Sequence, residues 1–166
     1  MTKRGFTFIE ILSILAIICI LIAVSYPSLI NIQEERQLEN TARDVLTTLQ
    51  QAKFYAVKTK LNHRVIFLNE KGVWIFFIEK EDNRDEWNQI SGFMRKSIPL
   101  RFNVYINLPN QTVVFSPLGL IPNFTTGQNN VTLQSPKLRR YNKADQRSIN
   151  VFAGGSVRYL KSWSEK

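Results

Sequence analysis

The chain has 166 residues, of which 44% are hydrophobic and 21% are charged. This composition is sufficient for a packed core and excludes a globally disordered chain, and the length fits about one domain beside any membrane segment. The 22 Lys and Arg against 13 Asp and Glu give a net charge of +9, which favours polyanionic partners. One cysteine excludes a disulfide framework within the chain, and a single histidine beside it gives little support to zinc or Cys–His chemistry.

An apolar run covers residues 6–26, and Glu10 is the only charged residue in it. As a helix this run measures about 31 Å, enough to cross the roughly 30 Å hydrocarbon core of a bilayer. Lys3 and Arg4 precede the run, and basic flanks stay on the cytoplasmic side. The sequence therefore predicts a single membrane-spanning helix with its N-terminus in the cytoplasm and the remainder of the chain outside.

The first ten residues carry a second pattern. Residues 3–10 read KRGFTFIE, with Gly-Phe after two basic residues and an acid four positions after the Phe. This pattern resembles the class III leader of type IV prepilins and type II secretion pseudopilins, G-F-[ST]-L-[IVL]-E, with Phe8 in place of Leu. The resemblance implies that prepilin peptidase cuts between Gly5 and Phe6 and that Phe6 is then N-methylated. It also implies a bacterial inner-membrane protein with a periplasmic head that enters a pilus or pseudopilus after assembly.

Glu10 and Pro27 match two further positions of these proteins. By resemblance, the Glu10 carboxylate meets the new amine of Phe6 in a neighbouring subunit and sets the axial stagger. Pro27 matches a proline that kinks the helix. The implied partners are prepilin peptidase, the inner membrane and other pilin or pseudopilin subunits. Residues 1–5 are then the leader peptide, and residues 6–30 are the transmembrane and assembly helix.

Beyond Pro27 the helical pattern resumes. Apolar residues recur at spacings of three and four, at Leu38, Ala42, Val45, Leu46, Leu49, Ala52 and Ala56. This periodicity predicts an amphipathic stalk helix over residues 31–62 that packs on a sheet. The expected fold class is α+β, with a long N-terminal transmembrane and stalk helix packed on a small antiparallel β-sheet domain, the pilin fold.

Residues 63–166 are predicted to form a β-rich globular head. Alternating or apolar β-rich runs predict strands at residues 64–68, 73–78, 98–106, 113–115, 131–133, 149–152 and 157–160. The first two strands are joined by Asn69-Glu70-Lys71-Gly72, which is typical of a hairpin. Residues 79–86 are predicted to be a charged turn, and residues 135–147 a basic loop.

Three segments of the chain resemble the GspH/FimT family of minor pilins and pseudopilins. They are the stalk segment 42–60, VVFSPLG at residues 113–119, and INVFAGGSVR at residues 149–158. In the FimT-like branch, minor pilins bind DNA during natural transformation through a C-terminal hairpin with the motif G-R-x-R. The corresponding residues here are Gly155-Ser156-Val157-Arg158, which keep the second Arg and have Ser156 at the first.

The C-terminal thirty residues, 137–166, contain eight basic residues against two acids. Tyr141, Tyr159 and Trp163 lie among them, and such a mixture suits binding of a phosphate backbone with occasional stacking. The implied partner is double-stranded DNA, bound without reading its sequence. The candidate DNA-binding residues are Arg139, Arg140, Lys143, Arg158 and Lys161.

Two other roles stay open for the same basic head. One is a minor pilin with a structural or initiating role at the pilus tip, and the other is a GspH-like minor pseudopilin of type II secretion without DNA binding. We do not expect an enzyme, a cofactor or a metal. His63 is expected at the surface, and the sequence contains no G-x-S-x-G motif and no phosphate-binding Gly-rich loop.

Overall fold

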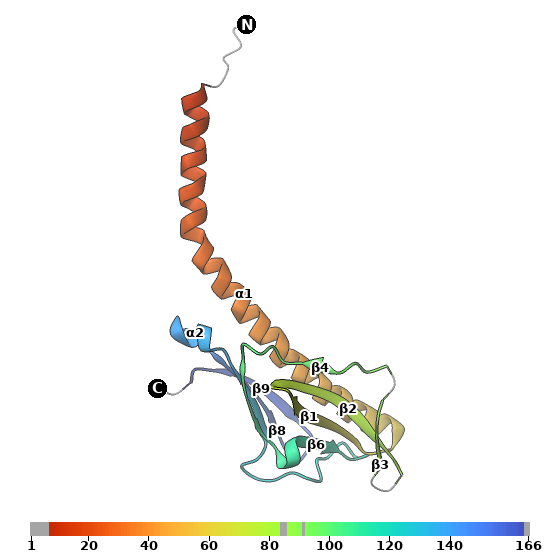
Figure 1. Ribbon diagram of the computed structural model, residues 1–166. Helices are drawn as coiled ribbons and strands as arrows, with labels where there is room; N and C mark the ends of the chain where they lie inside the picture. The colour runs from red at the N-terminus through yellow and green to blue at the C-terminus, as the bar shows by residue number, and fades with distance from the viewer. Residues whose placement is uncertain (1–6, 84–85, 91, 165–166) are drawn as a thin grey trace.

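The computed structural model describes residues 7–83, 86–90 and 92–164, with the backbone alone for residues 24–30 and 83. One long helix, α1 (Phe8–Thr59), is followed by two antiparallel sheets (Figure 1). The N-terminal part of α1 projects away from the sheets, and its C-terminal part lies along them. This arrangement agrees coarsely with the predicted α+β class, but the head is built from two sheets where a single small one was expected.

Local signals define both ends of α1. At its start the Thr7 hydroxyl accepts a hydrogen bond from the backbone N–H of Glu10 at 3.3 Å, which caps the first turn. At its end Lys60 adopts a left-handed φ of 61° and donates its backbone N–H to the Ala56 carbonyl at 3.1 Å. The chain therefore leaves the helix just before the first strand.

The prediction of a membrane-spanning helix is wrong. Among the described residues, no helix is both long enough and apolar enough to cross a membrane. The apolar part of α1 with described side chains is residues 8–23, about 24 Å of helix against a hydrocarbon core of about 30 Å. The described side chains resume at Asn31, and charged residues follow from Glu34 onward. The predicted transmembrane helix and the single-pass inner-membrane location with a periplasmic head are corrected accordingly.

The C-terminal half of α1 forms one wall of the hydrophobic core. The predicted apolar stripe is confirmed, because six of its side chains are fully buried and Leu46 is partly buried. The fully buried residues are Leu38, Ala42, Val45, Leu49, Ala52 and Ala56. Since α1 contacts strands of both sheets, this one stripe holds the two sheets together.

The first sheet has the strand order β3-β2-β1-β6, and β4 pairs with β2. Its strands are β1 (His63–Glu70), β2 (Val73–Asn83), β3 (Glu86–Gln89), β4 (Lys96–Ser97) and β6 (Thr112–Phe115). The predicted hairpin between β1 and β2 is confirmed. Lys71 and Gly72 both adopt positive φ, and Asn69 Oδ1 accepts a hydrogen bond from the Gly72 N–H at 2.9 Å.

The second sheet has the order β5-β7-β8-β9. Its strands are β5 (Asn103–Asn107), β7 (Asn130–Gln134), β8 (Gln146–Val151) and β9 (Val157–Ser162). The connections include a short 3-10 helix, η1 (Pro109–Gln111), and a short α-helix, α2 (Pro136–Arg140). Alternate residues of β8, Arg147, Ile149 and Val151, are buried. An arginine therefore occupies a core position beside two aliphatic residues.

Several local predictions are wrong. Residues 79–83 continue β2 and pair with β3, where a turn was expected. No continuous strand covers residues 98–106, because the Phe102 N–H bonds the Pro99 carbonyl in a turn and β5 begins after it. The expected loop at residues 135–147 contains α2. His63 is only 1% exposed, because β1 begins at this residue and strand alternation places it on the same face as the buried Val65.

Candidate nucleic-acid interface

The apolar start of α1 is exposed along its whole described length. Its large exposed side chains are Phe8, Ile9, Ile11, Leu12, Ile14, Leu15, Ile17, Ile18, Ile20, Leu21 and Ile22. Glu10 is also exposed there, in the first turn. The predicted processing residues Gly5 and Phe6 lie outside the described residues, and so does the side chain of Pro27.

Two of the candidate DNA-binding residues, Arg139 and Arg140, lie on α2. Ser135 caps this helix, because its hydroxyl oxygen accepts a hydrogen bond from the Leu138 N–H at 3.3 Å. The same hydroxyl donates to Oε1 of Glu34 on α1 at 2.9 Å. Leu138 is fully buried and anchors α2 on the core. The helix is thus fixed where α1 meets the head, with both arginines exposed.

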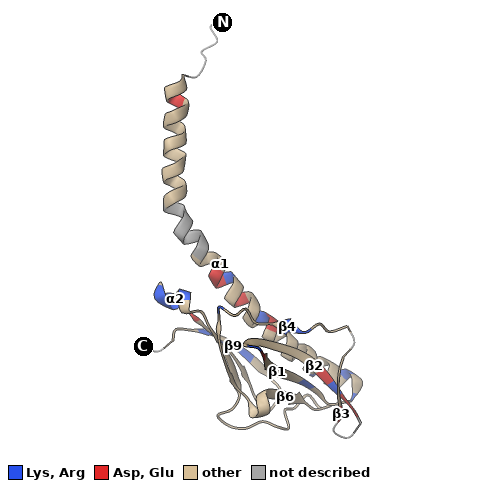
Figure 2. Cartoon of the chain, viewed as in Figure 1, with Lys and Arg blue, Asp and Glu red and all other residues tan. Residues whose placement is uncertain are grey.

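Among the described residues, no ion pair includes any member of the basic cluster of Arg139, Arg140 and Lys143. The charge of Lys143 is, however, close enough to Glu35 to contribute to the lowered pKa of that carboxyl. Figure 2 shows α2 as a basic element on the side of the head from which the start of α1 projects. Free cations concentrated in this way attract phosphate groups. These three residues are therefore the part of the predicted interface that forms no ion pair among the described residues.

Arg147 is a contrasting case, because its side chain is fully buried. Its Nε donates to Oε2 of Glu39 at 3.0 Å, and its Nη1 donates to the carbonyls of Ala144 and Gln146 at 3.0 and 2.9 Å. Its Nη2 lies 3.6 Å from Oε1 of Glu35. These contacts make Arg147 a structural cation between β8 and α1 that is closed to a phosphate.

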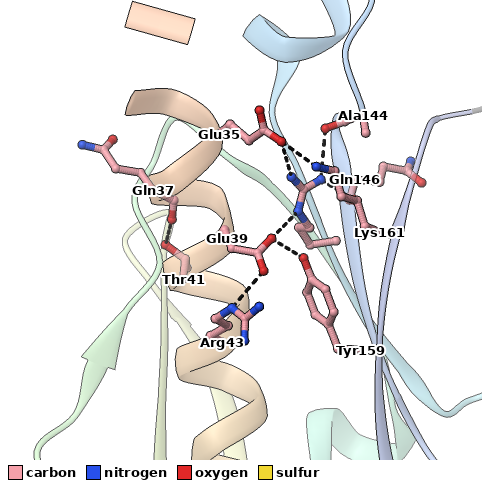
Figure 3. Close-up of polar contacts among 10 residues, drawn as sticks. Glu35, Gln37, Glu39, Thr41, Arg43, Ala144, Gln146, Tyr159 and Lys161 are labelled. Carbon is pink, nitrogen blue, oxygen red and sulfur yellow. Dashed lines mark hydrogen bonds and ion pairs between the residues drawn. The ribbon is translucent and has the colours of Figure 1, made fainter. Parts of the chain in front are cut away.

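Two side chains of β9 contact the same pair of carboxylates (Figure 3). The Tyr159 hydroxyl donates to Glu39, and Nζ of Lys161 lies 2.5 Å from Oε1 of Glu35. Lys161, one of the predicted DNA-binding residues, is therefore already paired with an acid on α1.

The same contacts shift the pKa values of the network. Burial works to raise the pKa of Glu39, but hydrogen bonds from Tyr159 and Arg147 outweigh burial and lower it. The hydrogen bond from Lys161 lowers the pKa of Glu35. Burial, together with the hydrogen bond to Glu39, raises the pKa of Tyr159. Both carboxylates are thus held in their charged form.

Arg158 lies on the other face of β9. Side chains alternate along a strand, so Tyr159 and Lys161 face α1 while Arg158 is exposed on the opposite side. Its guanidinium carbon lies 5.5 Å from the centre of the Phe152 ring. The structure therefore does not bring Arg158 together with the basic cluster on α2.

Gly155, the glycine of the tetrad that resembles G-R-x-R, has a packing role. It adopts a φ of 71°, and a Cβ placed on it would lie 1.8 Å from the carbonyl oxygen of Gly119. Its own carbonyl accepts a hydrogen bond from Nζ of Lys53 on α1 at 2.9 Å. Only glycine fits this close approach between the β8–β9 turn and the loop that contains Gly119.

Asp145 and Trp163 belong to this region but are not among the predicted candidates. Asp145 is buried and accepts hydrogen bonds from Nε2 of Gln134 at 3.0 Å and from both the N–H and the hydroxyl of Ser164 at 2.8 Å. Burial works to raise the pKa of Asp145, but these hydrogen bonds outweigh burial and lower it. A single acid inside an otherwise basic loop was the sequence signal for this anchoring role.

Of the five candidate DNA-binding residues, Arg139 and Arg140 are exposed on α2 with the half-buried Lys143 just after it, Lys161 is paired with Glu35, and Arg158 lies on another face. Comparisons of the chain with protein-family models, with curated proteins and with solved structures found no match. What this region does is therefore inferred from its own residues.

Proposed function

We propose that the chain is a minor subunit of a type IV pilus or a related filament and that its basic head binds DNA for uptake in natural transformation. The observation that supports the filament role is the exposed start of α1, which is apolar on all sides between Phe8 and Ile22 apart from Glu10 and Ser13. A helix that is apolar on all sides is stable only when its surface is buried against other apolar groups, away from water. In this proposal the same helix of neighbouring subunits supplies those groups.

The charge of Glu10 fits this assembly. After removal of the leader between Gly5 and Phe6, the amine of Phe6 in one subunit pairs with the carboxylate of Glu10 in the next. In an apolar helix bundle such a pair offsets the desolvation of both charges. It also favours one axial position of the subunits, because any other register leaves Glu10 buried without its partner.

The DNA-binding part of the proposal rests on the free cations near α2. Arg139 and Arg140 are exposed, and neither they nor Lys143 form an ion pair within the part of the chain that the structure describes. Contacts of Lys and Arg with phosphates release counterions and require no sequence reading. Uptake of DNA needs only this kind of contact.

A filament subunit without DNA binding is the second candidate. The observation that favours it is that Glu39 and Glu35 on α1 hold Arg147 and Lys161, so part of the C-terminal basic character serves to attach the second sheet to α1. Such a subunit would have a structural or initiating role at the tip, or would be a GspH-like pseudopilin of type II secretion.

The filament role is tested by co-expressing the full chain with a prepilin peptidase and measuring its mass. We expect loss of residues 1–5 and addition of one methyl group to Phe6. The Gly5→Ala variant should remain uncut, and normal cleavage of that variant would contradict the leader assignment.

Assembly is tested with a Glu10→Ala variant. This variant should be processed but excluded from sheared filaments, whereas Ser13→Ala, a matched change at an exposed polar residue one helical turn away, should enter them. Filaments that contain Glu10→Ala at the native level would remove the proposed role of Glu10.

A further inference from the structure

The indole of Trp163 lies in the middle of the basic region near α2. Trp163 follows β9 directly and is 57% exposed. It lines two neighbouring hollows, of about 470 Å³ and 240 Å³, and Lys143 lines both with it. Arg139 lines the smaller hollow together with Asp145, and Lys161 lines the larger one together with Glu35, its ion-pair partner. The exposed ring thus has two cations beside it that form no ion pair among the described residues, Arg139 and Lys143.

This position of Trp163 is built into the fold. Asp145 accepts hydrogen bonds from the N–H and the hydroxyl of Ser164, the next residue, at 2.8 Å each. Nε2 of Gln134 on β7 donates a hydrogen bond to the same carboxylate at 3.0 Å. The backbone of Arg139 is fixed in turn, because the buried Leu138 anchors α2. The segments that carry Trp163 and Arg139 are therefore held in place without a ligand.

This combination matches the two chemical parts of an unpaired nucleotide. Cations bind the phosphate, and an aromatic ring stacks with the face of a base. In a duplex the faces of the bases are covered by their neighbours in the stack, so Trp163 would gain nothing from them. An unpaired strand offers each base face to the indole.

We infer that the Trp163 region binds single-stranded DNA in preference to duplex DNA, with one base stacked on Trp163 and adjacent phosphates on Arg139 and Lys143. The inference rests on the proposed DNA-binding function and names the form of DNA that this site takes. On this inference, the head binds unpaired DNA strands or the unpaired ends of strands.

The test uses the full chain in mild detergent, which keeps the apolar start of α1 from self-association. Binding is measured by fluorescence anisotropy at low salt with three labelled probes of equal length. These are oligothymidylate, a duplex, and a strand of abasic sugar-phosphate that has the phosphates but lacks the bases. We expect the thymidylate strand to bind about tenfold or more tightly than the abasic strand, which is the contribution of one stacked base.

The Trp163→Ala variant should lose about tenfold in affinity for the thymidylate strand and nothing for the duplex or the abasic strand. Trp163→Phe should keep most of the affinity, because it retains an aromatic face. Tyr105→Ala is the matched control, since Tyr105 is 54% exposed on β5 and lines neither hollow. Equal unfolding temperatures of the variants show that the fold is intact.

The outcomes separate this inference from the proposed function. Duplex binding as tight as single-strand binding, unchanged by Trp163→Ala, would overturn the inference and leave DNA binding in place. Equal binding of the thymidylate and abasic strands, with an acidic polysaccharide competing as well as DNA, would show a polyanion site without base contacts and would also overturn it. No binding of any probe would overturn this inference and the DNA-binding part of the proposed function together.

Discussion

Nε of Arg147 on β8 lies 3.0 Å from Oε2 of Glu39 on α1, across 108 residues of sequence. With Tyr159 donating to the same carboxylate, this contact attaches the second sheet to the helix. In the proposed filament α1 is the part held by neighbouring subunits, and the head is carried by its contacts with that helix. The Glu39–Arg147 pair therefore belongs to the connection between filament and head.

Replacing Glu39 should destabilise the chain more than replacing Arg43, its ion-pair partner one turn further along α1. Glu39→Ala leaves the fully buried Arg147 with Glu35, 3.6 Å from Nη2, as its remaining acidic partner among the described residues, and removes the acceptor of the Tyr159 hydroxyl. Loss of one partner from a buried ion pair costs about 3 kcal/mol of unfolding free energy. The measurement is urea unfolding of the full chain in mild detergent.

Arg43→Ala is the matched control for this prediction. Arg43 also pairs with Glu39, at 2.9 Å, but its side chain is 63% exposed. Exposed helix pairs of this spacing contribute about 0.3–0.5 kcal/mol. Equal losses for Glu39→Ala and Arg43→Ala would show that burial of Arg147 does not govern the stability of this contact.

Acid should destabilise the chain because the pKa values of Glu35, Glu39 and Asp145 are lowered in the folded state. As the pH falls, the unfolded chain binds protons before the folded chain does. The stability that these groups contribute is therefore complete above about pH 5 and is lost progressively below it. In Glu39→Gln the loss below about pH 5 should be smaller. A free energy of unfolding that is independent of pH in this range would contradict the prediction.

His63 should add a separate loss of stability on acidification, one that begins at a higher pH than the loss from the carboxylates. Burial lowers the pKa of His63, so below about pH 6.5 only the unfolded chain takes up its proton. Its contribution to stability is thus complete above that pH and decreases as the pH falls. His63→Gln should remove this first decrease and keep the second one, as measured by urea unfolding at a series of pH values. A decrease that begins near pH 6.5 in the variant as well would assign it to another group.

The parts of the fold that depend on neighbouring residues were predictable. Spacings of three and four identify the buried stripe from Leu38 to Ala56, and the turn residues Lys71 and Gly72 identify the β1–β2 hairpin. The acidic partners of Arg147, Glu35 and Glu39, were not predictable, because they lie on an element more than a hundred residues away. Its burial left a trace in the alternation of Arg147, Ile149 and Val151, which a count of charges does not reveal.

The candidate site was predictable in composition but not in arrangement. The charge count identifies Arg139, Arg140 and Lys143, which lie on α2 and just after it and form no ion pair among the described residues. The same count gives no sign that Lys161 is neutralised by Glu35, because that acid is on α1.

The apolar length of residues 6–26 led to the prediction of a membrane-spanning helix, which the described part of α1 does not bear out.

Gly155→Ala should lower the stability of the head. The new Cβ would lie 1.8 Å from the Gly119 carbonyl oxygen at a residue with a φ of 71°, so the backbone has to shift. We expect a loss of about 2–4 kcal/mol in unfolding free energy. Gly154→Ala is the control, because nothing lies within 4 Å of a Cβ at Gly154. Similar losses for the two variants would contradict the packing role of Gly155.

The proposed DNA binding predicts a steep dependence on salt that the basic cluster controls. The logarithm of the binding constant should fall linearly with the logarithm of salt concentration, by about 0.9 for each phosphate contact. Arg139→Ala/Arg140→Ala should therefore reduce the slope by about 2. Lys161→Ala should change it less, since Lys161 is paired with Glu35 in the folded chain.

The matched control for the double variant is Arg36→Ala/Lys58→Ala, which removes two exposed charges from α1 and changes the net charge equally. If both double variants reduce the slope to the same extent, the effect comes from net charge, and the cluster near α2 is not the site. If the native chain binds no DNA at low salt, the DNA-binding part of the proposal fails. The exposed apolar start of α1 would then leave a structural subunit of the filament, or a secretion pseudopilin, as the function with support.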